Sequence, residues 1–211
     1  VSGCLVYSRE IALRSNALRC AVFDAEADPK PQAGNPMRWD IGRKMGEIVV
    51  LSATGFEQEA LRERVEEGVR QRVAGREWVS GKVGGEEVLL VATGIGAVNA
   101  AHALTCVLQG RRPAWVLQVG VGGAYPQSGL GIGDWALASE ENYGDLGVRT
   151  EKGWQGGDVI GIPVLDGDVV RYNNFPLDGA WVQQAAGILP EAHVGPFVTV
   201  QECSGTDALG L

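Results

Sequence analysis

The sequence predicts an α/β protein with a mixed, largely parallel central sheet that helices flank. Three observations indicate this class. Apolar runs of buried-strand type recur along the chain, glycine-containing turns follow them, and helical segments follow two of those turns. Strand, turn and helix in this order favour parallel strands joined by crossover helices. In such folds ligands bind outside the carboxyl ends of the strands.

The chain changes character at Met45. Before it, the stretch DAEADPKPQAGNPMRWDIGRK has three prolines, mixed charges and no sustained periodicity. That composition is typical of irregular chain. We therefore expect an irregular N-terminal leader over residues 1–44 and a folded domain over residues 45–211.

The first strand of the domain is predicted over residues 48–51, a continuous apolar run that ends at the SATG break. From Phe56 onward, Leu61, Val65 and Val69 recur at helical spacing. This spacing predicts that a helix follows the first strand and presents one apolar face to the core.

A hairpin and a second helix are predicted next. Residues 78–82 and 87–92 read as strands that flank the Gly84-Gly85 dipeptide, a strong turn signal. The second strand leads into the turn TGIG, and a helix over residues 98–108 follows. Alanines at positions 100, 101 and 103 allow this helix to lie close to the sheet.

The next strand, residues 113–119, leads into the glycine-rich stretch LQVGVGGAYPQSGLGIGDW. Residues 133–139 return as a strand, EENYGDLGV follows as a loop, and FVTVQEC is a last strand. A turn with so few side chains indicates that another group closely approaches its backbone.

Composition excludes several classes of protein. The chain has 211 residues, a formal net charge of −8 and no basic cluster, which argues against a nucleic-acid surface. Its four cysteines are widely spaced and its two histidines lie far apart, so we expect reduced thiols and no zinc site. No apolar run approaches the roughly 18 residues of a membrane span, and no signal peptide is evident. We expect a cytoplasmic protein.

Two ways of binding a nucleotide fit poorly. GIGAVN comes within one residue of the dinucleotide fingerprint and follows a strand, but the next strand ends without the ribose-binding acid. Neither glycine loop has the Gly-Lys-Ser/Thr ending of a P-loop, and between Lys82 and Arg149 only Arg111 and Arg112 are cationic. The loops therefore suit a neutral, flat or polyhydroxylated ligand better than a phosphate.

Four segments carry a resemblance to a known family: IVVLSATGFEQEAL, VATGIGAVNAAHAL, LQVGVGGAYPQSGLGIGDWALASEENYGDLGV and TVQECSGTDA. From about residue 45 to 211 the chain resembles the nucleoside phosphorylase/hydrolase superfamily. GGAYP and YGDLG make it most similar to the futalosine hydrolase branch, a relative of methylthioadenosine/S-adenosylhomocysteine nucleosidase. The resemblance implies a three-layer α/β/α sandwich around a mixed sheet, a homo-oligomer (dimer or larger), and neither metal nor organic cofactor.

The resemblance also implies a role for each site residue. Glu57 would position and deprotonate the attacking water, a task worth roughly 10²–10⁴ in rate. A glutamate near a helix N-terminus is also favoured by the helix dipole alone. The residues implied to bind the purine nucleoside are Thr93, Gly94 and Gly96 on the ribose side, Gly120, Val121, Gly122 and Gly123 along the base and ribose, and Cys203 at the purine edge.

The activity implied is hydrolysis of the N-glycosidic bond of a purine nucleoside, with futalosine as the preferred substrate and hypoxanthine as the product, in menaquinone biosynthesis. The family's Met-Glu and Ser-Asn or Ser-Asp motifs do not occur before Leu211, so we expect a domain shortened at its C-terminus. Methylthioadenosine/S-adenosylhomocysteine nucleosidase, a phosphorylase, a non-catalytic nucleoside-binding module and a dinucleotide-binding domain stay open as alternatives.

Overall fold

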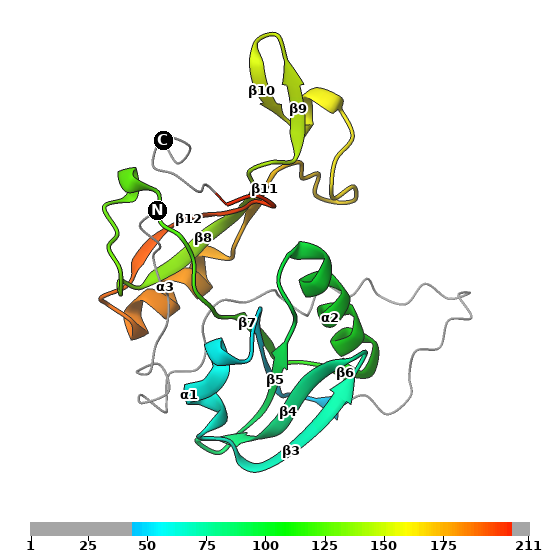
Figure 1. The fold of residues 1–211 in the computed structure, drawn as a ribbon, viewed down its shortest axis with the longest axis vertical. Coiled ribbons are helices and arrows are strands. Elements are labelled where there is room, and N and C mark those ends of the chain that lie inside the picture. The colour runs from blue at the N-terminus through cyan, green and yellow to red at the C-terminus, as the bar shows by residue number, and fades with distance from the viewer. Residues whose placement is uncertain (1–43, 204–211) are drawn as a thin grey trace, which may run out of the picture. The chain divides into compact units, whose positions relative to one another are not determined.

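The computed structural model describes residues 44–203, which fold into two compact units, residues 44–123 and 124–203 (Figure 1). Except for Lys44, the predicted leader lies outside the described residues. The α/β class with a mixed sheet is confirmed. No helix among the described residues is long and apolar enough to cross a membrane.

The first unit is built on a five-stranded sheet with the strand order β3-β4-β5-β2-β7. β2 lies between β5 and β7 and is parallel to both, whereas β4 lies between β3 and β5 and is antiparallel to both. The predicted hairpin across Gly84-Gly85 is confirmed as β4 and β5. The strands of this unit are β1 (Lys44–Met45), β2 (Ile48–Ser52), β3 (Glu66–Val73), β4 (Arg76–Val83), β5 (Glu86–Ala92), β6 (Arg111–Arg112) and β7 (Trp115–Gln118).

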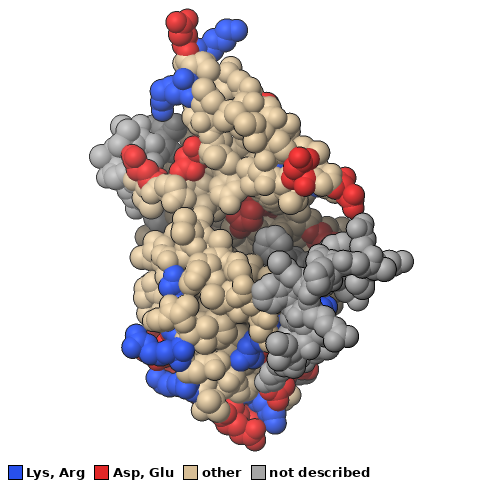
Figure 2. All heavy atoms as spheres, turned by 90° about the vertical axis from the view of Figure 1, so that its right-hand side faces the viewer, with Lys and Arg blue, Asp and Glu red and all other residues tan. Residues whose placement is uncertain are grey.

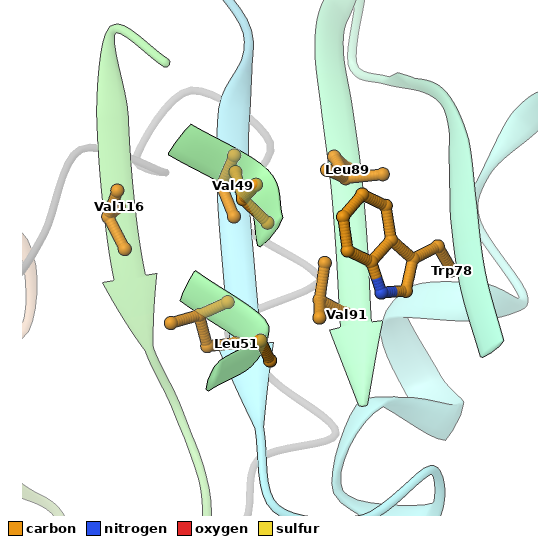
Figure 3. Packing of buried hydrophobic residues seen from close by; sticks show 8 residues of the cluster. Val49, Leu51, Trp78, Leu89, Val91 and Val116 are labelled. Atoms are coloured by element: carbon orange, nitrogen blue, oxygen red, sulfur yellow. The ribbon is translucent and has the colours of Figure 1, made fainter. Parts of the chain in front are cut away.

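The core of this unit covers both faces of the sheet, because every residue of β2 is buried. On one face Val49, Leu51 and their neighbours pack with Ala103 and Val107 of helix α2 (Ala97–Gly110). Figure 3 shows Trp78 of β4 lying beside Leu89 and Val91 of β5 in this cluster. The opposite face packs against a segment with two short helices, η2 (Phe56–Gln58) and α1 (Glu59–Arg62). The predicted helix over residues 98–108 is confirmed, with Ala103 buried and Ala101 exposed.

The prediction of one long helix from Phe56 is wrong beyond Arg62. Residues Glu66–Val73 form strand β3, which pairs with β4 across the two-residue turn Ala74-Gly75. Both turn residues have positive φ, 50° and 79°, the geometry of a tight hairpin turn. Pairing with β4 therefore overrides the helical spacing of the valines. Val69 is 60% exposed instead of lying on the predicted apolar face.

A buried ion pair closes the end of the sheet opposite the carboxyl ends of its parallel strands. Glu47 precedes β2 and is fully buried, and both its oxygens accept from Arg111 Nη1, at 2.8 and 2.7 Å. The Glu47 carbonyl also accepts from Ala114 N, just before β7. This pair fixes the entries of β2 and β7 relative to each other.

The second unit has a three-stranded sheet in the order β11-β8-β12, with β8 parallel to β12 and antiparallel to β11. The predicted strand over residues 133–139 is shifted, because β8 continues through Glu140–Tyr143, which we expected to be loop. The elements of this unit are η3 (Pro126–Ser128), β8 (Ala136–Tyr143), β9 (Gly147–Thr150), β10 (Gly153–Gly156), η4 (Gly157–Ile160), β11 (Asn174–Pro176), α3 (Gly179–Ile188) and β12 (His193–Thr199).

Charges of both signs mix on the surface. On the face in Figure 2, blue Lys and Arg side chains are interspersed with red Asp and Glu side chains and form no continuous basic stripe. In the first unit, Lys82 and Glu67 of the β3–β4 hairpin form an ion pair at 3.3 Å.

Candidate functional site

Three turns of the first unit meet at the carboxyl ends of β5, β2 and β7. Thr93 N donates to Ser52 O at 2.7 Å, which joins the turn after β5 to the end of β2. Val119 N donates to Leu51 O at 2.9 Å on the other side of β2. Since adjacent parallel strands end at the same edge, both predicted glycine turns lie beside the turn after β2.

Glu57 lies in the turn after β2 and reaches the turn after β7. Its Oε2 accepts from Thr54 N and from Thr54 Oγ1, each at 2.7 Å, and its Oε1 accepts from Val121 N at 3.0 Å. The sequence separation between Glu57 and Val121 is 64 residues. The structure thus brings two predicted site residues into direct contact. Thr54, which the sequence did not identify, supplies two of the three donors.

Gly120 explains why the turn after β7 needs glycine. A Cβ built on Gly120 would lie 2.6 Å from Glu57 Oε1, closer than real Cβ contacts come. The group that approaches this backbone is therefore the Glu57 carboxylate. At Gly123 a Cβ would meet nothing within 4 Å. Gly122 lies between them in the same turn, on the exposed surface.

The turn after β5 is fixed from inside the unit. Thr93 is buried, and its Oγ1 donates to Ser52 O at 3.1 Å. Gly94 and Gly96 have φ of +89° and +93°, which L side chains rarely adopt. Asn99 supports the turn, because its Nδ2 donates to Ile95 O at 2.7 Å.

Asn99 is in turn held by a cation that the sequence did not identify. Arg76 of β4 donates from Nη2 to Asn99 Oδ1 at 2.5 Å. A Cβ on Gly94 would lie 3.2 Å from the Asn99 side chain. The GIGAVN stretch therefore owes part of its pattern to packing between Gly94 and Asn99, and Arg76 of β4 holds the Asn99 side chain in that place.

Cys203 lies in the second unit, at the exposed end of the described chain. The other candidate residues all belong to the first unit, so the predicted place of Cys203 at the purine edge stays a prediction. β12 ends at Thr199, four positions before Cys203.

The YGDLG motif of the second unit fastens the segment that follows β12. Gly144 N donates to Thr199 O at 2.9 Å, and Asp145 Oδ2 accepts from Gln201 N. A Cβ on Gly144 would lie 2.5 Å from Val198 Cγ1. The motif thus has a structural role within its own unit, between the end of β8 and the end of β12.

Glu141, in the second unit, has a shifted pKa. Burial raises the pKa of Glu141, on β8, because desolvation disfavours its charged form. Among the side chains that the structure describes, no group of three or more His, Cys, Asp or Glu could hold a metal ion.

Comparison with known proteins gives a family and a fold. The model of the phosphorylase superfamily matches residues 47–208. The 5'-methylthioadenosine/S-adenosylhomocysteine nucleosidases of Bacillus thuringiensis (strain Al Hakam) and Bacillus anthracis are each 35% identical over 116 residues. That alignment covers 55% of this chain and 49% of each relative, so the chain spans about half the length of the curated relatives it matches.

Solved structures show the same fold. The S-adenosylhomocysteine nucleosidase of Streptococcus pyogenes, in complex with 5-methylthiotubericidin, superposes with a TM-score of 0.64 at 20% identity. The 5'-methylthioadenosine/S-adenosylhomocysteine nucleosidase of Colwellia psychrerythraea, in complex with adenine, gives 0.64 at 21% identity. Each match covers 81% of this chain and 69% of the crystallised chain.

Proposed function

The chain belongs to the phosphorylase superfamily, and from this membership we propose that it acts as an N-ribosyl hydrolase on a purine nucleoside. The observation that most supports the proposal is the place of Glu57. Its carboxylate lies at the carboxyl edge of the parallel strands and bridges the turns after β2 and β7. The names of the curated relatives and the adenine in one related structure agree with a purine substrate.

The hydrogen bonds of Glu57 support a role in activating water. A carboxylate has about four acceptor positions, and Thr54 and Val121 use three of them. The position that is left can accept a hydrogen bond from the attacking water. As the glycosidic bond breaks, its electron pair departs with the purine, which takes up a proton from solvent, and positive charge develops on the ribose. Water then adds to C1′ and passes a proton to Glu57. General-base assistance of this kind contributes roughly 10²–10⁴ in rate.

The glycine turns would supply the surface for the nucleoside. Around Gly96 and Gly123 no atom lies within 4 Å of an added Cβ, so main chain faces open space there. In our proposal residues 93–96 line the ribose side and residues 120–123 lie along the base and the ribose. The segment that ends in Cys203 borders the purine in the same proposal.

Futalosine is the substrate we propose first, because GGAYP and YGDLG resemble the futalosine hydrolase branch. Hypoxanthine would be the released base, in menaquinone biosynthesis. Methylthioadenosine or S-adenosylhomocysteine is the second candidate, which the names of the curated relatives favour.

The test offers futalosine, methylthioadenosine and S-adenosylhomocysteine separately to the purified protein and follows free base by liquid chromatography. Hypoxanthine from futalosine supports the first substrate, and adenine from either of the others supports the second. Glu57→Gln is expected to lower the rate by about 10²–10⁴. If calorimetry detects nucleoside binding but no base is released, the chain is a binding module. Light scattering on the same sample checks the predicted homo-oligomer.

The structure changes one argument against a phosphorylase. Besides the two arginines between Lys82 and Arg149, Arg62 and Arg76 also reach the turns. A Cβ on Gly55 would lie 3.7 Å from Arg62 Nη1, and Arg76 donates to Asn99. Arg62 is also paired with Glu77. A hydrolase stays the proposal, and turnover that rises with added inorganic phosphate and yields ribose 1-phosphate would overturn it.

A further inference from the structure

The segment that carries Glu57 has little stability of its own. It consists of the three residues of η2 and the four residues of α1, and neither helix has a side-chain hydrogen bond at its N-cap. A helix this short is not stable in isolation. Contacts with the sheet must therefore fix the position of Glu57.

Gln58 provides the strongest of these contacts. Its side chain is 1% exposed, and its Nε2 donates to Val50 O at 3.0 Å and to Val91 O at 3.1 Å. These carbonyls belong to β2 and β5, two neighbouring strands. Both amide hydrogens are thus used, as burial of a carboxamide requires.

Arg62 extends the attachment to a third strand. Its Nη1 forms an ion pair with Glu77 Oε1 of β4, and its Nη2 donates to Gln58 Oε1 at 3.4 Å. The Arg62 side chain is 17% exposed. The segment is therefore joined to β2 and β5 through Gln58 and to β4 through Arg62.

Because Gln58 is the next residue after Glu57, its attachment to the sheet also sets the direction of the Glu57 side chain. In a 3₁₀ turn, with three residues per turn, consecutive side chains point about 120° apart. When Gln58 points down onto the sheet, Glu57 is directed sideways, where it meets Thr54 and Val121. A displacement of about 1 Å at such a site is enough to cost roughly 10²-fold in rate.

We propose that Gln58 is a positioning residue for Glu57, and that the two hydrogen bonds from its amide set the carboxylate between Thr54 and Val121. The placement of the carboxylate is independent of the reaction, whereas the effect on turnover rests on the proposed function.

The first test measures placement without any activity. Amide hydrogen exchange by NMR reports on Thr54 N–H and Val121 N–H, which both donate to Glu57. Gln58→Met keeps the length of the side chain and removes both donors, and we expect about tenfold faster exchange at these two amides. In a Glu57→Ala background, Gln58→Met is expected to add nothing at Val121. An unchanged rate at both amides in the single variant, or equal acceleration in both backgrounds, overturns the proposal.

A milder pair of variants tests the same link in case Gln58→Met does not fold. Glu77→Gln removes the ion pair between Glu77 and Arg62 and leaves Gln58 unchanged. We expect about threefold faster exchange at the same two amides. Glu67→Gln removes a carboxylate from another ion pair of the same hairpin, with Lys82, and is expected to leave both amides unchanged. Equal effects of the two variants would show that the hairpin in general, and not the link through Arg62 and Gln58, places Glu57.

The second test uses turnover. Gln58→Met is expected to lower kcat about 10²-fold with KM unchanged, and to cause no further loss in the Glu57→Ala background. A loss of the same factor in both backgrounds contradicts a role through Glu57. If Glu57→Ala itself keeps full activity, the proposed function fails, and the exchange measurements still decide the role of Gln58.

Discussion

Gly120→Ala tests the contact between the glycine-rich turn and the Glu57 carboxylate. The added Cβ would lie 2.6 Å from Glu57 Oε1, whereas ordinary van der Waals contact begins at 3.4 Å. Because Gly120 does not have a positive φ, alanine meets no backbone penalty there. The substitution therefore acts only through the carboxylate.

The expected loss of stability and turnover in Gly120→Ala follows from this distance. To restore ordinary contact the two atoms must move apart by about 0.8 Å. A shift of that size also disturbs the 3.0 Å bond from Val121 N to Oε1. Overpacking costs about 1–3 kcal/mol, and we expect the lower end because Glu57 is only half-buried. Turnover is expected to fall roughly 10²-fold.

Urea unfolding of four proteins measures the effect: wild type, Gly120→Ala, Glu57→Ala and the double variant. Since Glu57→Ala removes the atoms in the way, Gly120→Ala should cost almost nothing in that background, a coupling of about 1 kcal/mol. Gly123→Ala is the matched control, because its Cβ would meet nothing within 4 Å, and it should stay within about 0.5 kcal/mol of wild type. The reasoning is refuted if Gly120→Ala is as stable as wild type, or costs the same in both backgrounds.

Three further predictions concern the ion pair and the second unit. Arg111→Met removes two hydrogen bonds from the fully buried carboxylate of Glu47 and should cost about 3–5 kcal/mol in urea unfolding, whereas replacing both residues by methionine should cost clearly less. Burial raises the pKa of Glu141, so its stabilising contribution is present below its ordinary pKa and is lost as pH rises through the folded value. Glu141→Gln should therefore be more stable than wild type near pH 7 and lose this advantage near about pH 4, as unfolding at both pH values would show. Asp145→Ala removes the acceptor of Gln201 N and should speed hydrogen exchange at residues 199–203 without slowing refolding of the first unit; unchanged exchange there would contradict the role of the motif.

Local sequence signals predicted much of the first unit. The apolar run over residues 48–51 is buried along its whole length, and Gly84-Gly85 marks a real hairpin turn. The failure at residues 66–73 has a physical cause. Val65 and Val69 keep helical spacing, but the backbone of β3 gains its hydrogen bonds from β4. The Ala74-Gly75 dipeptide was the signal for that hairpin.

The site was predicted only in part, because its geometry depends on contacts between distant residues. Resemblance to the family identified Glu57 and the two glycine turns, and the structure shows Glu57 in contact with one of them. Gln58 donates to Val91, 33 positions away, and Arg76 reaches Asn99, 23 positions away. No local pattern marks such partners. They follow from the order of the strands, which sequence periodicity does not determine.

The hydrogen bonds that hold the Glu57 carboxylate have a consequence for the end of a catalytic cycle. Its Oε1 accepts from the main chain of one turn and its Oε2 from the main chain of another. Under the proposed reaction, water leaves its proton on Glu57 at the acceptor position that Thr54 and Val121 do not use. The carboxyl group then loses its negative charge, so the hydrogen bonds from the two turns become neutral and weaker. The two turns would thus be held less tightly to each other when free base and sugar have to depart.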